Sequence, residues 1–275
     1  MIWPHATKVN PCPICNGVDW CTFGQRAMLC QRVESDKPST KGGWYHFYGD
    51  NQASRPLVLP KAKLAPAHID AERIINKLRG STYRIDTFAQ ILGVSLESLE
   101  RLNTAWDNSH KALAFPMSDG AGRHIGIRLR NNDGFKWAIT GSRQGIFLPQ
   151  QSVTNGNARW IAYLPEGPTD TAAMLTMGLF AIGRPSCNGG NEQIKEALKR
   201  LRIGRVVVVA DNDGIKTGGR RPGLEGAIKL KKFLGLPSVI WMPPSPIKDV
   251  REFLNKGGTA QMIEAEIKNK VWNRL

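Results

Sequence analysis

The sequence contains no apolar run that approaches the roughly 20 residues of a membrane-spanning helix. Its start, MIWPHATKVNPCPIC, also lacks the apolar core of a secretion signal. It holds only five cysteines, an odd number that argues against a disulfide framework. Together these absences predict a cytoplasmic protein with no membrane partner.

Acidic residues are scarce as well. The 275-residue chain has 23 Asp and Glu against 38 Lys and Arg, so its net charge is +15. The basic residues are spread along the chain, which fits a polyanionic partner better than a basic tail that only aids solubility. Such an excess is typical of proteins that bind nucleic acid.

Four of the five cysteines lie within the first 30 residues, a clustering that favours a metal site. Cys12 and Cys15 form a C-P-I-C knuckle with the spacing of a zinc site, and Cys30 is a third candidate ligand. Spacing leaves the fourth ligand open between Cys21 and His46. We therefore predict a structural Zn²⁺ in a small zinc-ribbon domain. Its aromatic residues either stack on single-stranded DNA or fill the core of a domain too small to have much of one.

Composition divides the chain into parts. Residues 1–48 are the expected zinc ribbon, and residues 49–67, with three prolines, are the expected linker. Residues 68–157 show helical periodicity followed by short strands with hairpin turns, which predicts a basic α+β subdomain. Residues 158–275 alternate strands with helices, which predicts an α/β domain built on a parallel sheet.

Individual elements can be placed from the same patterns. The expected helices are 69–80, 84–94, 95–102, 169–178, 191–201 and 223–235. The expected strands are 111–117, 123–130, 134–140, 145–149, 160–165, 179–183, 205–210 and 238–242.

Carboxylates follow the expected parallel strands. Glu166 comes after one strand with Asp170 in the next helical turn, RVVVVA runs into Asp211 and Asp213, and Asp249 follows the last strand. Because parallel strands end at one edge of the sheet, we expect these groups to lie together. A lone Asp-x-Asp is weak evidence, since loop aspartates often form turns. Close unpaired carboxylates repel one another, whereas a hard cation neutralises them. We therefore predict that these strand-end carboxylates bind a divalent cation such as Mg²⁺.

These motifs resemble a known domain. Glu166-Gly-Pro-Thr-Asp170, Asp211-Asn-Asp213 and Gly223-Leu-Glu-Gly-Ala227 are similar to the TOPRIM domain of primases and topoisomerases, over roughly residues 158–258. A zinc ribbon, a linker and a basic β-rich region ahead of such a domain resemble bacterial replicative primases and phage primase-helicases. The N-terminal pattern also resembles a phage or plasmid family, through Cys12, Cys15, Asp19, Trp20, Cys21, Gly42, Gly43, Trp44 and His46.

The resemblance implies a DNA primase that makes short RNA primers from ribonucleoside triphosphates on a single-stranded DNA template. It implies a two-metal nucleotidyl transfer in which Glu166, Asp211, Asp213 and Asp249 bind Mg²⁺ or Mn²⁺. It also implies catalytic roles for Glu166, Asp170, Asp211, Asp213 and Asp249, with Glu166 as candidate general acid or base. Strand alternation puts Arg128 and Arg130 on one face. The cations expected to bind nucleotide or nucleic acid are Arg128, Arg130, Lys136, Arg143, Lys216, Arg220 and Arg221.

Some features depart from the resemblance. The loop RPSCNGGN is longer and more polar than expected, and Ile215 stands before Lys216 where a Walker A loop needs glycine. A replicative helicase is therefore expected to be a separate protein. Four tyrosines in so short a chain argue against a topoisomerase. A TOPRIM nuclease and a non-catalytic accessory protein that binds single-stranded DNA remain alternatives.

Overall fold

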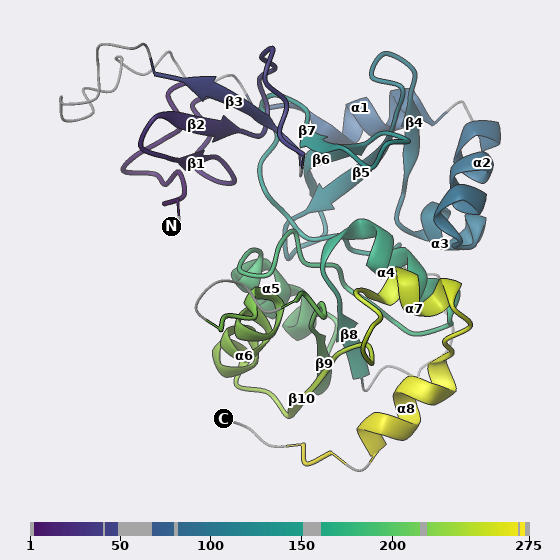
Figure 1. Ribbon diagram of the computed structural model, residues 1–275. Helices are drawn as coiled ribbons and strands as arrows, with labels where there is room; N and C mark the ends of the chain where they lie inside the picture. Colours follow the sequence, from purple (N-terminus) through teal and green to yellow (C-terminus); the bar gives the residue numbers. More distant parts are fainter. Residues whose placement is uncertain are drawn as a thin grey trace.

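Figure 1 shows a computed structural model of the chain. The structure describes residues 3–40, 42–48, 68–79, 82–150, 161–214, 219–268 and 270–272. We name three parts: the cysteine segment (3–48), the antiparallel domain (68–150) and the parallel domain (161–272). The expected linker, the expected boundary at residue 158 and Lys216 lie outside the described residues. Within these ranges no helix has the length and apolar character to cross a membrane.

The parallel domain is a sheet between two layers of helices (Figure 1). Its strands are β8 (Ile161–Leu164), β9 (Arg205–Val209) and β10 (Ser238–Trp241), paired in parallel in the order β10-β9-β8. Its helices are α4 (Gly167–Thr176), α5 (Asn191–Arg200), α6 (Pro222–Leu234), α7 (Val250–Asn255) and α8 (Ala260–Lys268). The expected parallel α/β architecture is confirmed. The predicted starts of three strands and three helices lie within about two residues of the observed ones: β8, β9, β10, α4, α5 and α6.

The valines of β9 alternate between the two faces of this sheet. Val206 and Val208 belong to the hydrophobic cluster of α5 and α6, while Val207 and Val209 belong to the cluster of α4, α7 and α8. A central parallel strand is covered on both sides, so every residue of its core must be apolar. This burial is what holds the end of β9 in place.

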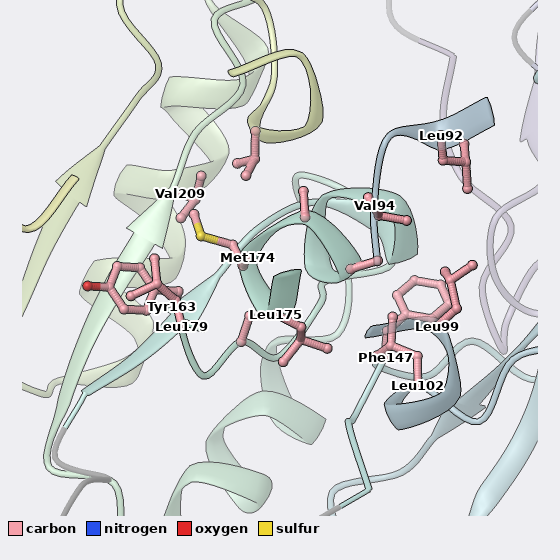
Figure 2. Close-up of a cluster of buried hydrophobic side chains, with 14 of the residues drawn as sticks. Leu92, Val94, Leu99, Leu102, Phe147, Tyr163, Met174, Leu175, Leu179 and Val209 are labelled. Atoms are coloured by element: carbon pink, nitrogen blue, oxygen red, sulfur yellow. The ribbon is translucent and has the colours of Figure 1, made fainter. Parts of the chain in front are cut away.

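The hydrophobic cluster that contains Val207 and Val209 continues beyond the parallel domain. Figure 2 shows Tyr163, Met174 and Leu175 of the parallel domain in the same region as Leu99 and Phe147 of the antiparallel domain. Burial of one shared apolar cluster stabilises the two domains as a unit, since apolar area removed from water contributes about 25 cal/mol per Å². The relative position of the two sheets is thereby set.

The antiparallel domain consists of three helices and a four-stranded sheet. The helices are α1 (Ala71–Leu78), α2 (Thr82–Leu92) and α3 (Leu96–Arg101). The strands are β4 (Ala105–Asp107), β5 (Ala112–Ser118), β6 (His124–Arg130) and β7 (Lys136–Ala138), in the order β4-β5-β6-β7. The sequence patterns did not predict β4, which is short and fully buried.

Two expected strands exist only as isolated bridges. In the segment 145–149, Ile146 bridges to Ser118 of β5 and Phe147 bridges to Gly183. In the segment 179–183, Ala181 also bridges to Tyr163 of β8. Each segment is short and changes partner within a few residues, so neither forms a continuous ladder. The two segments instead join the antiparallel sheet to the parallel sheet.

The cysteine segment contains β1 (Thr22–Phe23), β2 (Ala27–Cys30) and β3 (Trp44–Phe47), and it lies against the antiparallel domain. The backbone N–H of Ala138 donates to the carbonyl of Gln31 at 3.1 Å. Trp44, 7% exposed, packs into the core of the antiparallel domain. Gly42 has φ +107°, and a Cβ there would lie 2.1 Å from the carbonyl oxygen of Lys136. Only glycine permits this close approach.

Candidate active site

The four N-terminal cysteines form one buried cluster. The sulfur atoms of Cys12, Cys15, Cys21 and Cys30 all lie within 4.8 Å of one another. Four thiolates around one zinc ion are about 3.8 Å apart, because Zn–S bonds are about 2.3 Å long and tetrahedral. The ring of His46 instead has its Nε2 3.1 Å from the carbonyl oxygen of Val33. The structure therefore places Cys21, and not His46, in the set that fits Zn²⁺.

Glu166 lies where β8 leads into α4. It is the N-cap residue of that helix, yet its side chain makes no capping hydrogen bond. Its backbone pairs in parallel with Arg184, which holds the chain extended beyond the end of β8. The carboxylate is thus positioned by the sheet and left available for another ligand.

Asp211 lies beyond the end of β9, beside the start of α6. Gly223 approaches so closely that a Cβ there would lie 2.6 Å from the carbonyl oxygen of Asp211. The next residue, Asn212, donates its side-chain amide to the carbonyls of Pro243 and Ile247 at 3.4 and 3.2 Å. These contacts draw the segment after β10 toward Asp211. Nothing in the sequence indicated this role of Asn212.

Asp249 and Asp170 are joined through the start of α7. Asp249 caps α7, with Oδ1 accepting from the backbone N–H of Glu252 at 2.8 Å. Oδ1 of Asp170 accepts from the backbone N–H of Arg251 at 2.9 Å, which ties α4 to α7. The sequence places Asp249 eight residues past the end of β10, and this cap brings it back to the other carboxylates.

These carboxylates meet cations of the antiparallel sheet around one cavity of about 120 Å³. The parallel domain contributes Glu166, Asp170, Asp211 and Asp249, and the facing sheet contributes Arg128, Arg130 and Lys136. Arg128 and Arg130 alternate along β6 and both line the cavity, as strand alternation predicts. The arrangement suits a ligand that carries both a metal ion and phosphate groups.

Burial and mutual repulsion perturb the acidic groups of the cavity. Burial raises the pKa of Asp211 to about 8, and the nearby charges of Asp170 and Glu166 add to the effect. Burial also raises the pKa of Asp170 to about 7, with Asp249 adding and the hydrogen bond from Arg251 opposing. Without a neutralising cation, these two carboxyls therefore retain protons near neutral pH.

The cations are perturbed in the opposite direction. Burial lowers the pKa of Arg128 to about 10, against the attraction of Glu166. Burial lowers the pKa of Arg130 and of Lys136 below their usual values, and repulsion by neighbouring arginines adds a smaller effect in the same direction. Cations held close together without full compensation fit an anionic ligand such as a phosphate.

The other expected residues of this site that the structure describes lie outside this cavity: Asp213, Arg143, Arg220 and Arg221. Asp213 is close enough to Asp211 to raise its pKa, but it does not line the cavity. Arg143 lines a different cavity of about 470 Å³, beside Cys15 and Gly17. Arg220 pairs with Glu225 at 2.6 Å on the exposed surface, and Arg221 caps α6 and is also exposed.

A larger cavity of about 530 Å³ adjoins the acidic one and shares Arg128 and Glu166 with it. Its wall includes Trp20 and Gln31 of the cysteine segment and Gln144 of the antiparallel domain. Its size falls within the range of small-molecule sites, about 300–1,000 Å³. Elements from all three parts of the chain thus surround the combined space.

Arg184 is a second residue that the sequence did not reveal. It is fully buried, and its guanidinium donates to the carbonyls of Leu164, Val209 and Cys187 at 3.1, 2.6 and 3.2 Å. Leu164 and Val209 are the last residues of β8 and β9. Arg184 therefore links the two strand ends that carry Glu166 and Asp211. The only signal in the sequence is an arginine directly after an apolar segment, which is too common to be informative.

The donor chemistry fits a hard divalent cation. Carboxylate oxygens are the preferred protein ligands of Mg²⁺, which keeps several waters and usually takes only one or two carboxylates besides substrate phosphates. Among the described residues, only the four thiolates have ligand atoms gathered within 4.8 Å. The more open carboxylate group suits a metal whose coordination a bound substrate completes.

No protein-family model matches the chain, and no curated protein matches its sequence significantly. In fold it is similar to DnaG-type primase catalytic cores. A DnaG primase catalytic domain bound to single-stranded DNA has a TM-score of 0.57 and 14% identity, over 73% of this chain and 77% of that chain. A DNA primase domain from Pseudomonas aeruginosa has a TM-score of 0.54 and 13% identity, over 74% and 78%. At such identities the likeness shows the fold.

A third structure, the zinc-binding and RNA polymerase domains of the Aquifex aeolicus primase, has a TM-score of 0.52 and 13% identity, over 70% of this chain and 58% of that chain. This neighbour also carries a zinc-binding domain, by its description. The chain therefore has a primase-like fold that includes a buried four-cysteine cluster.

Proposed function

We propose that this chain is a DNA primase that synthesises short RNA primers on single-stranded DNA. The observation that carries the proposal is the acidic cavity itself, in which strand-end carboxylates of the parallel domain face Arg128, Arg130 and Lys136 on a primase-like fold. The parallel domain, on this proposal, is a TOPRIM domain. The net charge of +15 supports a nucleic-acid template as partner.

In the proposed reaction the 3′-hydroxyl oxygen of one nucleotide attacks the α-phosphorus of a ribonucleoside triphosphate, and pyrophosphate leaves. Bound Mg²⁺ or Mn²⁺, held by Glu166, Asp211, Asp213 and Asp249, would lower the pKa of the hydroxyl and offset the phosphate charge. Glu166 makes no capping hydrogen bond and is our candidate to accept the hydroxyl proton. Asp170 holds α7, and with it Asp249, against the site.

The cations divide into two groups in this proposal. Arg128, Arg130 and Lys136 line the acidic cavity and would bind the triphosphate. Arg143, Arg220 and Arg221 lie further out and would contact template phosphates, a role we also propose for Lys216. The adjoining 530 Å³ cavity offers room for a nucleotide next to the reacting groups.

The four-cysteine cluster would hold a structural Zn²⁺. We further propose that the protein acts in the cytoplasm, with a replicative helicase supplied as a separate chain, and that it derives from a phage or other mobile element. The N-terminal residue pattern supports this origin, and the absence of a Walker A loop around Lys216 supports the separate helicase.

The test is incorporation of labelled ribonucleotides on a panel of single-stranded DNA templates with Mg²⁺ or Mn²⁺. Wild type should make short RNA, and Asp211→Asn should reduce the rate at least about 100-fold while keeping the fold. Glu97→Gln, an exposed carboxylate on α3, is the matched control and should behave as wild type.

The alternatives predict other products. Shortened template would identify a nuclease that uses the same carboxylates. Retained binding of single-stranded DNA without any product would identify a non-catalytic accessory protein. Near-normal synthesis by a folded Asp211→Asn protein would contradict the proposed mechanism.

A further inference from the structure

A chain of side chains connects the cysteine cluster to the acidic cavity. Arg32 donates to the sulfurs of Cys15 and Cys21 at 3.7 and 3.6 Å and forms an ion pair with Asp19. Trp20, the residue between Asp19 and Cys21, has the guanidinium carbon of Arg32 5.4 Å from its ring centroid. The indole is therefore anchored beside the cluster that fits zinc.

The same indole reaches the active site. The guanidinium carbon of Arg128 lies 4.8 Å from the ring centroid of Trp20, within the range of a cation–π contact. Among the described residues, no carboxylate lies within 4.0 Å of the charged nitrogens of Arg128. The face of Trp20 is thus a close partner for an arginine that lines both cavities with Glu166.

The position of Trp20 over β6 is itself fixed by polar contacts between the cysteine segment and the antiparallel domain. Oδ2 of Asp19 accepts from the backbone N–H of Gln144 at 3.1 Å, and Nε of Arg32 donates to the carbonyl of Ser142 at 3.2 Å. The hydroxyl of Thr140 donates to the carbonyl of Arg32 at 2.9 Å. These bonds flank Trp20 on both sides in sequence, so the ring is held in register with Arg128.

We propose that Trp20 is a positioning residue through which the cysteine segment completes the active site. It holds the guanidinium of Arg128 beside Glu166, where Arg128 meets the triphosphate of the incoming nucleotide; this step rests on the proposed function. Two guanidinium groups already contact the ring of Trp20, so the ring binds these cations and does not stack on a nucleic-acid base. Binding of the triphosphate, more than turnover, then depends on Trp20.

The first test compares Trp20→Leu and Trp20→Phe in primer synthesis at varied ribonucleotide concentration. Loss of a desolvated cation–π contact should raise KM for the nucleotide roughly 3- to 30-fold, with kcat changed less, and phenylalanine should restore part of the loss. Trp44→Phe is the matched control, because Trp44 also packs into the antiparallel domain but contacts Phe135 and Trp137 instead of Arg128. Its KM should stay close to that of wild type.

A double-mutant cycle separates positioning from general stability. Arg128→Gln should raise KM on its own, and adding Trp20→Leu should change KM by less than about 2-fold more, because the arginine to be held is absent. If Trp20 only stabilises the cysteine segment, the two effects multiply, and the inference is overturned. Zinc content and melting temperature of each variant are measured in parallel, and Trp20→Phe takes the place of Trp20→Leu if the latter does not fold.

A spectroscopic readout needs no catalysis. In ¹⁵N-labelled protein, the Nε–H resonance of Arg128, assigned as the signal absent from Arg128→Lys, should carry the ring-current shift of Trp20. Trp20→Leu should remove this shift and Trp44→Phe should keep it. An unchanged resonance in Trp20→Leu, or a KM change no larger than that of Trp44→Phe, overturns the inference. If wild type makes no RNA, the proposed function fails, and binding of Mg–ATP by calorimetry to the same variants then decides the positioning role.

Discussion

Replacing Arg184 with methionine should disrupt the carboxyl ends of β8 and β9. Methionine fills similar space but cannot donate to the carbonyls of Leu164, Val209 and Cys187, which now accept at 3.1, 2.6 and 3.2 Å. An unpaired buried carbonyl costs about 1–3 kcal/mol. Cys187 borders the larger cavity, where water can replace the lost donor, so the cost falls mainly on the two strand ends.

The charge of Arg184 also contributes to the unfolding free energy. Glu166 and Asp211 oppose the effect of burial on its pKa, so the guanidinium compensates part of the acidic cavity. Removing one member of a buried charged network typically costs 3–5 kcal/mol. Two unpaired carbonyls, or one member missing from the charged network, each correspond to a loss of unfolding free energy of about 4 kcal/mol. Such a loss lowers the Tm by roughly 10 °C for a protein of this size.

Urea unfolding followed by circular dichroism measures this loss. Arg184→Lys keeps the charge but has a single donor nitrogen, which cannot reach all three carbonyls, and should recover about half of the stability. Arg123→Met is the matched control, because Arg123 is exposed and pairs with Asp119 on the surface, where such pairs contribute less than about 1 kcal/mol. If the unfolding free energy of Arg184→Met lies within about 1 kcal/mol of that of wild type, Arg184 does not link the two strand ends.

Two further predictions concern the metals. In metal-free protein, Asp211→Asn should raise the unfolding free energy by about 1–3 kcal/mol at pH 8 and by less at pH 5, as measured by urea unfolding. The sign follows because the folded pKa of about 8 lies above the unfolded value, so the stability of wild type is lost as pH rises; a gain that does not vary with pH would contradict it. Removing zinc by chelation should speed hydrogen exchange in β1, β2 and β3 while β8 to β10 stay protected. Unchanged protection of β1, β2 and β3 would show that the cysteine segment does not depend on the cluster.

Much of the parallel domain could be predicted from the sequence because its signals are local. A strand buried on both faces must be apolar throughout, and RVVVVA has no other reasonable interpretation once amphipathic helices flank it. The strand ends then determine where Glu166 and Asp211 lie. The shorter elements were predicted less well: β4 was missed, and 145–149 and 179–183 form bridges instead of strands, since their pairing depends on two different sheets.

The site was predictable in part for the same reason. The C-P-I-C spacing indicates a metal knuckle within four residues, whereas the choice of Cys21 over His46 depends on how β1, β2 and β3 fold around it. No position for Arg143 relative to the other cations followed from the sequence. In the structure it lines a separate cavity near Cys15, because the segment after β7 turns toward the cysteine segment.

The sequence by itself determined the alternation of strands and helices, the cysteine knuckle and the carboxylates at the strand ends, because each arises from neighbouring residues and backbone periodicity. Only the tertiary structure decided that Arg184 joins β8 to β9 and that Trp20 meets Arg128. These contacts connect residues up to more than a hundred positions apart, such as Trp20 and Arg128. Their geometry is set by how three hydrophobic cores pack against one another, and no local pattern encodes it.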